Sequence, residues 1–182
     1  GVSLAGDGSG TITATGINCP GTCSNDYPYG TTVVLQASPA PGSTFAGWSG
    51  ACTGTGGCQL VLSAARSVTA TFTRIPLCTL RILTNKIVRK LAASVRCDEP
   101  ARLTLTGELT VVGKNRSAIR LGPVHATSWP GVVTSLSLTL PKRALGQLRK
   151  HTKEFVMLTL SASNANGTAT VHSPRTALKP TR

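Results

Sequence analysis

Apolar residues recur at every second position in several short segments of the first 75 residues, and glycine, proline or asparagine separates these segments. The pattern covers residues 11–17, 31–37, 59–62 and 67–72, with Ile12, Val33, Leu35, Val68 and Phe72 at the apolar positions. Alternation of period two is typical of strands that bury one face. This part of the chain therefore predicts a turn-rich all-β domain.

The second half of the chain shows the same alternation in longer segments. Strands are expected over residues 78–84, 91–97, 101–112, 135–140, 155–163 and 168–173. The alternation places Glu108 outward, and the apolar start of 155–163 fits a central strand. Residues 141–153 break the pattern, because Ala144, Leu145 and Leu148 gather on one side of a short helix that begins at a proline. Six or seven strands with such connections favour an immunoglobulin-like sandwich, so the predicted fold class is all-β with one short helix.

Charge divides the chain at the same place as the change in segment length. Residues 1–73 carry Arg66 against Asp7 and Asp26, a net charge of −1, out of +13 for the 182 residues. Residues 74–182 carry the other 18 basic residues against four acids, a net charge of +14. We therefore predict a domain over 1–74 and a basic domain over 75–182.

The six cysteines fall into three close pairs. These pairs are Cys19 with Cys23, Cys52 with Cys58, and Cys78 with Cys97. No spacing typical of a metal site accompanies them, and the histidines lie far from the first two pairs, so disulfides are the simpler interpretation. Cys78 and Cys97 fall on the apolar faces of their strands, where a cross-strand or inter-sheet bridge is expected. Disulfides imply an oxidising compartment.

The motifs of residues 8–73 resemble a known module. Gly16-Ile17-x-Cys19, Tyr29-Gly-Thr-x-Val33, Phe45-x-Gly-Trp48-x-Gly and Val68-Thr-Ala-x-Phe72 occur in order with the first two cysteine pairs. This segment closely resembles the bacterial extracellular repeat related to the B-repeat of internalin-type surface proteins. The resemblance implies a small β-grasp-like domain that serves as a non-catalytic building block of secreted and cell-wall-attached proteins. The second half is similar, more weakly, to β-sandwich modules that follow such repeats in secreted actinobacterial proteins.

The resemblance also implies structural roles for particular residues. The Cys52–Cys58 pair is expected to pin a glycine-rich hairpin, and Trp48 and Tyr29 to be core and corner residues. An alternative is that Trp48, Tyr27 and Tyr29 contact a ligand, because exposed aromatic rings stack on sugars.

Little in the sequence favours catalysis. It has no Gly-x-Ser-x-Gly elbow, no paired carboxylates at a defined separation and no calcium loop. His125, His151 and His172 lie in polar segments typical of solvated surface groups. An intramolecular Lys–Asn bond, as in some pilins, with Glu108 or Glu154 as the acid, is a minor alternative. We expect a protein that is not an enzyme and has no cofactor and no bound metal.

The basic surface of the second half is the strongest indication of a partner. A dense positive field attracts polyanions such as teichoic acid, acidic polysaccharide or anionic headgroups. The candidate contact residues are Arg89, Lys90, Arg143, Arg149 and Lys150. Sequence-specific nucleic-acid binding is not expected, because aromatic residues for base stacking are scarce in this half. The charge has an equally simple alternative interpretation, which is solubility.

These observations predict a non-catalytic structural or adhesive protein that is secreted or on the bacterial cell surface. The basic second domain would contact polyanionic envelope or matrix polymers. A subunit of an extracellular fibre, joined to itself by strand addition, is a second hypothesis, and an accessory domain of a secreted enzyme is a third. No apolar run in the sequence has the length of a transmembrane segment. The absence of an initiating Met or a signal-peptide pattern indicates a processed chain or a fragment.

Overall fold

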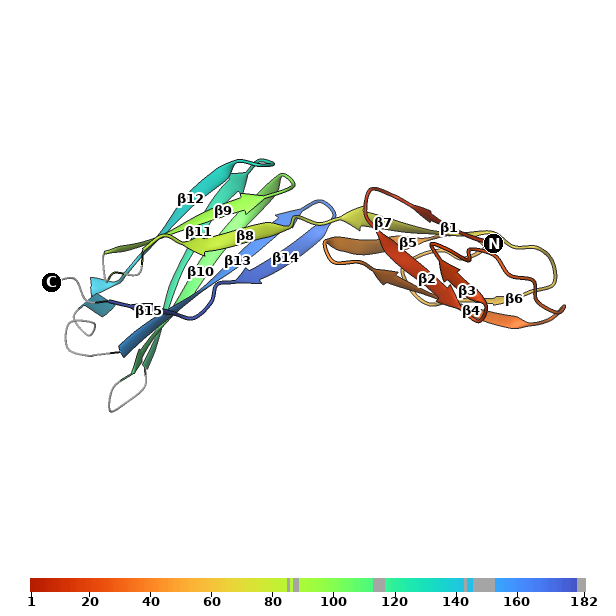
Figure 1. Cartoon of the computed structure of the whole chain (residues 1–182), viewed down its shortest axis with the longest axis horizontal. Coiled ribbons are helices and arrows are strands. Elements are labelled where there is room, and N and C mark those ends of the chain that lie inside the picture. The colour runs from red at the N-terminus through yellow and green to blue at the C-terminus, as the bar shows by residue number, and fades with distance from the viewer. Residues whose placement is uncertain (85, 87–88, 113–116, 143, 146–152, 180–182) are drawn as a thin grey trace. The chain divides into compact units, whose positions relative to one another are not determined.

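The computed structural model describes residues 1–182 except 85, 87–88, 113–116, 143, 146–152 and 180–182 (Figure 1). The chain divides into two compact units, Gly1–Ile75 and Pro76–Arg182. This division lies one residue after the boundary expected from charge. Both units consist of β-sheets, so the prediction of an all-β protein is confirmed.

The first unit is built from two sheets. One has the order β1-β7-β5 and the other the order β3-β2-β4-β6. The strands are β1 (Val2–Ala5), β2 (Gly10–Ala14), β3 (Ile17–Cys19), β4 (Thr32–Pro39), β5 (Ser43–Gly50), β6 (Cys58–Val61) and β7 (Val68–Arg74). The pair of β1 and β7 is parallel, whereas the other pairs of this unit are antiparallel.

The core of the first unit lies between these sheets. Ile12, Val33 and Leu35 come from one sheet, and Ala70 and Phe72 come from the other. These are the positions that the alternation predicted to be apolar and inward. The rings of Phe45 and Trp48 pack beside Phe72, with centroids of Phe45 5.0 Å from Trp48 and 5.6 Å from Phe72.

The second unit is a sandwich of two sheets. One has the order β12-β9-β8 and the other β11-β10-β13-β14, with β15 paired to β13. The strands are β8 (Cys78–Ile82), β9 (Lys90–Cys97), β10 (Ala101–Val112), β11 (Ser117–Ser128), β12 (Val133–Thr139), β13 (Lys153–Asn164), β14 (Gly167–His172) and β15 (Thr176–Leu178). The first, second and fifth strands of the unit share one sheet and the third, fourth, sixth and seventh share the other. This arrangement is typical of an immunoglobulin-like sandwich.

The two sheets of the second unit enclose an aliphatic core. Leu91, Ala93 and Val95 project from β9, and Leu103 and Leu105 project from β10. As the sequence predicted, β13 is a central strand and Glu108 is exposed. The expected helix over 141–153 falls largely outside the described residues, but Lys142, Ala144 and Leu145 are helical, and Ala144 is fully buried.

Candidate functional site

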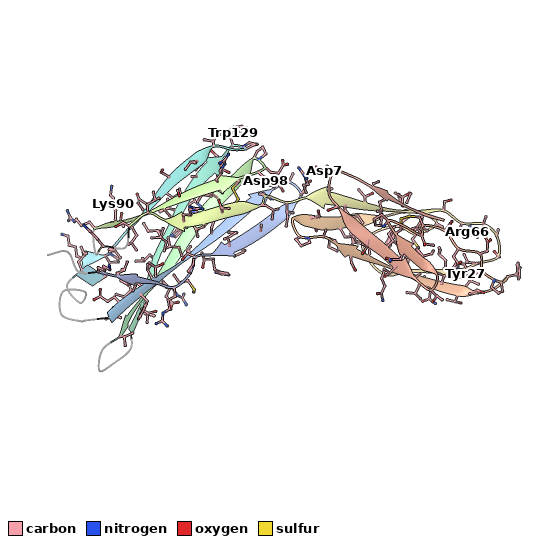
Figure 2. All side chains as sticks on the ribbon, in the orientation of Figure 1. Asp7, Tyr27, Arg66, Lys90, Asp98 and Trp129 are labelled. Carbon is pink, nitrogen blue, oxygen red and sulfur yellow. A yellow bond between two sulfur atoms is a disulfide. The ribbon has the colours of Figure 1, made fainter. Side chains whose placement is uncertain are left out.

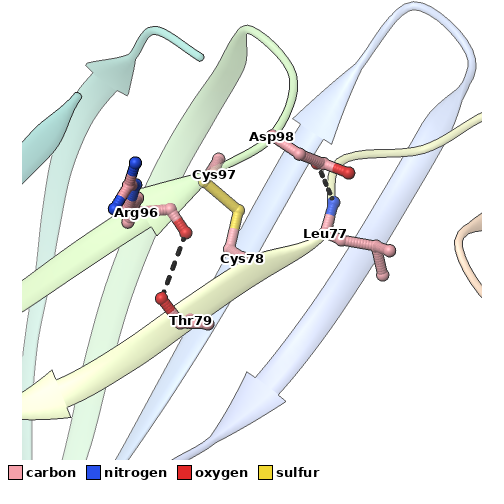
Figure 3. Close-up of a disulfide and its surroundings, with 6 residues drawn as sticks. All are labelled: Leu77, Cys78, Thr79, Arg96, Cys97 and Asp98. Carbon is pink, nitrogen blue, oxygen red and sulfur yellow. Dashed lines mark hydrogen bonds between the residues drawn. A yellow bond between two sulfur atoms is a disulfide. The ribbon is translucent and has the colours of Figure 1, made fainter. Parts of the chain in front are cut away.

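The three predicted disulfides are present, and each joins residues in or beside antiparallel strands. Cys19–Cys23 closes a turn in which Asn18 and Thr22 exchange backbone hydrogen bonds of 2.9 and 3.0 Å. Cys78 and Cys97 are direct register partners on β8 and β9, so this bridge is cross-strand within one sheet (Figure 3). At the edge of this bridge, the Leu77 backbone N–H donates to Asp98 Oδ1 at 2.7 Å, which holds the start of β8 against the end of β9.

The loop between Cys52 and Cys58 accepts hydrogen bonds from Trp48 in the first unit. The Trp48 backbone N–H donates to the Gly54 carbonyl at 2.7 Å, and the indole Nε1–H donates to the Gly56 carbonyl at 2.9 Å. The disulfide thus holds a glycine-rich loop over the polar edge of a core tryptophan. Trp48 is only 6% exposed and leaves no ring face for a sugar, so the structure contradicts the ligand-contact alternative for this residue.

The structure contradicts the core or corner role that was predicted for Tyr29. Its side chain is 85% exposed, and it is therefore not a core or corner residue. The physical reason is the turn around Gly30, which has a φ of 81° and is held by a hydrogen bond from the Thr31 N–H to the Pro28 carbonyl at 3.1 Å. This turn points the ring into solvent.

A cavity of about 410 Å³ lies in the first unit, and Tyr27 is in its wall. Its apolar floor contains Val33 and Leu35, and Asp26 and Arg66 also line it. Tyr27 donates its hydroxyl proton to the Thr15 carbonyl, which fixes the ring at this position. Figure 2 shows Tyr27 and Arg66 at the same end of this unit. Of the three aromatic residues considered as ligand contacts, Tyr27 and Tyr29 line this cavity, whereas Trp48 does not.

The outer face of the β12-β9-β8 sheet gathers positive charge. Arg81, Lys90 and Arg96 are exposed at outward positions of β8 and β9, and we call these three residues the basic face. Arg81 is paired with Ser94, whereas Arg96 is paired with Thr79, so the two arginines are diagonal neighbours. Arg89 is exposed directly before β9, and Lys90 is labelled in Figure 2.

The strands of the basic face carry mostly small, uncharged outward side chains, and the exposed Asp98 follows directly after β9. On β12, Arg96 is paired with the exposed Val133 and Lys90 with Thr139. Between these two pairs, Ser135 and Ser137 are the outward residues of β12. Strands β8, β9 and β12 contain no aspartate or glutamate. A flat surface with cations and no carboxylate on the same strands is electrostatically complementary to an anionic chain.

Three other residues predicted as ligand contacts cannot be placed on this surface. Arg143, Arg149 and Lys150, predicted as ligand contacts, lie outside the described residues, as does His151. Sequence reasoning did not single out Arg81 and Arg96 as a pair, because their proximity depends on the register between two strands. Their outward phase on neighbouring strands was the signal that could have found them.

The described histidines lie on the surface, whereas one glutamate lies in the core. His125 and His172 are exposed, and the Nδ1 atom of each lies 3.1 Å from a threonine hydroxyl, that of Thr104 and Thr159 respectively. Glu154 is 2% exposed on the inner face of β13, and burial raises its pKa to about 7. Among the described residues, no cluster of three or more His, Cys, Asp or Glu side chains could hold a metal ion. Nowhere in the described part of the chain is there an apolar helix of membrane-spanning length.

Fold and site together define a disulfide-containing all-β protein in which a near-neutral unit precedes a basic sandwich. Residues 1–76 match the family described as the divergent InlB B-repeat domain, which confirms the resemblance seen in the motifs of the first unit. The first unit is therefore similar to an extracellular bacterial surface repeat domain, and the two disulfides within it are consistent with that similarity. None of the curated proteins matches the chain.

Proposed function

We propose that the protein is a non-catalytic, extracellular attachment protein whose second unit binds anionic polymers of a cell envelope or matrix through the basic face. The observation that carries this proposal is the exposure of Arg81, Lys90 and Arg96 on one face of strands that contain no acid, with Arg81 and Arg96 as diagonal neighbours. The first unit, with its near-neutral charge and stapled turns, serves as the spacer that accompanies this surface.

The chemistry of the basic face favours a flexible polyanion over a small ligand. Two guanidinium groups diagonal to one another present planar donors that match phosphate, sulfate or carboxylate oxygens. The serines on this face are too small to shape a pocket, and the cavity lined by Tyr27 lies in the first unit. Binding of this kind depends on charge density and weakens as salt screens it.

The experiment compares the full chain with two double variants on immobilised poly(glycerol phosphate). R81Q/R96Q removes two charges from the basic face. The matched control R120Q/R175Q removes two charges from β11 and from the segment before β15. We expect the first variant to elute at clearly lower salt than the control, because the loss of adjacent charges removes a local field and not only net charge. Equal elution of both variants would show that the net charge alone governs retention and would contradict a dedicated face.

Self-association into a fibre by strand addition remains a distinct hypothesis. It predicts that the apparent molar mass measured by light scattering rises with protein concentration in the absence of any polymer. Light scattering of the same preparations therefore separates this hypothesis from a binding protein that stays monomeric.

A further inference from the structure

A second surface of the sandwich has a different chemistry from the basic face. A groove of about 500 Å³ lies at one end of the five-stranded sheet. We call it the Trp129 groove, and its lining includes Ala101, Arg102, Thr127, Trp129, Ser163 and Asn164. It belongs to the sheet that contains β10, β11 and β13, whereas the basic face belongs to β8 and β9.

Strand register brings the polar groups of this groove together. Arg102 of β10 is paired with Thr127 of β11 on one side and with Ser163 of β13 on the other. The three residues are therefore neighbours on the outer face, with Arg102 on the strand between Thr127 and Ser163. No acidic residue lines the groove. The floor can thus donate several hydrogen bonds and carries a positive charge.

Trp129 adds an aromatic wall that the fold leaves open. Its side chain is 64% exposed, although tryptophan is a residue that folding normally buries for much of its area (Figure 2). The first tryptophan of the chain, Trp48, is buried and hydrogen-bonded. An exposed indole ring beside hydroxyl and guanidinium donors matches a sugar ring, which has an apolar C–H face and a polar edge.

The backbone holds Trp129 in a fixed position. Residues 129–132 form a turn in which the Val132 N–H donates to the Trp129 carbonyl at 3.1 Å. Pro130 restricts one central position and Gly131 has a φ of 73° at the other, a value that glycine adopts most readily. The Gly131 N–H donates to the carbonyl of Cys97 at 3.0 Å, and Cys97 is bonded to Cys78. The disulfide thus braces the turn that presents the indole ring.

Such a fixed turn lowers the entropic cost of binding, because the backbone that carries the ring is ordered before the ligand arrives.

The outer face also continues beyond the groove in the direction of the strands. In the next row Thr104 is paired with His125 and Ser161. A chain that enters at Trp129 would therefore meet further hydroxyl and imidazole groups along the sheet.

We propose that the Trp129 groove binds an acidic saccharide chain, with one pyranose ring stacked on Trp129 and a uronate carboxylate held by Arg102. The positive charge of Arg102 and the absence of acid in the lining select a carboxylate-bearing sugar over a neutral one. Thr127, Ser163 and Asn164 supply the polar edge that sugar hydroxyls need. No residue lines both surfaces, although the Arg96 guanidinium lies beside Gly131 in the turn that carries Trp129. The variants W129A and R102Q therefore test this site without changing a residue of the basic face.

The experiment titrates the full chain with a tetramer of galacturonic acid and, as the neutral probe, with a tetramer of galactose of the same linkage. Tryptophan fluorescence and calorimetry report binding at low and at high salt. We expect the uronate tetramer to change the fluorescence, and W129A to weaken its affinity by about tenfold or more, as for the loss of a central aromatic contact. W129F should retain part of the affinity, and its melting curve, like that of W129A, should match the unsubstituted chain.

Two charge variants separate the role of Arg102 from net charge. R102Q is expected to bring the uronate affinity down to that of the neutral tetramer. Arg120 lies on the same sheet, outside the groove. R120Q also removes one positive charge, and it should leave the preference for uronate unchanged. A neutral tetramer that binds as tightly as the uronate would overturn the assignment of an acidic sugar. An affinity unchanged in W129A, or no binding by the unsubstituted chain, would overturn the site itself, whatever the outcome with poly(glycerol phosphate).

Discussion

The two units use aromatic residues in opposite ways. In the first unit Phe45, Trp48 and Phe72 pack ring against ring between the sheets. In the second unit the buried hydrophobic residues that the structure describes are aliphatic or cysteine, while Trp129 is exposed. A unit of about 75 residues has little apolar area to bury, and large rings supply much of it. The longer strands of the second unit enclose enough leucine and valine to leave its tryptophan available for a surface role.

The disulfides of the two units also differ, in the length of chain that each one closes. Cys19–Cys23 and Cys52–Cys58 span sequence separations of 4 and 6 residues, whereas Cys78–Cys97 spans 19. Closing the short loops restricts the unfolded chain by about 2 kcal/mol each and closing the longer loop by about 3 kcal/mol. The short bridges therefore act mainly on local geometry, at a turn and at the Trp48 loop. The longer bridge both stabilises the sandwich and fixes the end of β9.

The largest expected effect concerns the aromatic core. Phe72 is 1% exposed, and F72A should destabilise the first unit by about 3–5 kcal/mol, because it leaves a cavity between the sheets. Calorimetry of the full chain should show the transition of the first unit moving to a much lower temperature while the transition of the second stays in place. The matched variant L105A, at a fully buried leucine of the sandwich, should move the other transition. A single transition that shifts with both variants would contradict the description of two separate units.

A smaller effect is expected from Glu154, a buried carboxyl that has no described counterpart in the first unit. It faces the core opposite Val111 and Leu178, and its Oε1 atom has no hydrogen-bond partner among the described residues. Burial raises its pKa from 4.5 to about 7. The folded state thus keeps this proton up to about pH 7, whereas the unfolded state releases it near 4.5. The stability that the protonated carboxyl provides is fully present below pH 4.5 and is lost as the pH rises to 7.

The variant E154Q should remove this pH dependence. At pH 8 it should stabilise the second unit by at most about 3 kcal/mol relative to the unsubstituted chain, and the difference should shrink at pH 5. Urea denaturation at the two pH values measures both quantities. E108Q, at an exposed glutamate on the neighbouring strand β10, is the control and should leave the pH dependence as it is. If E154Q lowers stability equally at both pH values, the carboxyl has a structural partner and the expected titration is wrong.

Local pattern predicted most of the strands because burial on one face imposes period two on the sequence. The positions of Leu91, Ala93 and Val95 inward and of Glu108 outward follow from phase alone. The same parity could have placed Glu154 in the core, since Val156, Leu158 and Leu160 share its face. The outward residues Phe155 and Met157 obscured that signal, because they made both faces of the strand look apolar.

The candidate surfaces were harder to predict because they depend on contacts between strands. Arg81 and Arg96 are 15 positions apart and become neighbours only through the register of β8 and β9. Arg102, Thr127 and Ser163 meet through two registers. Tyr29 was misplaced because a turn can point an aromatic ring either way, and the alternation of neighbouring strands does not extend into it. The sequence therefore predicts which face a residue occupies better than it predicts which residues share a site.

The smallest expected effect tests the contrast between the two tryptophans. W48F keeps an aromatic ring in the first core but removes the hydrogen bond from Nε1 to the Gly56 carbonyl. Gly56 is exposed, so water can replace the donor, and the cost should be about 1 kcal/mol in the first unit. Thermal unfolding measures this change, and uronate binding should stay as in the unsubstituted chain. W129F should give the converse result, with melting unchanged and binding weakened, because its ring lies outside the core. A loss of binding in W48F with no change in melting would reverse the roles that burial assigns to the two rings.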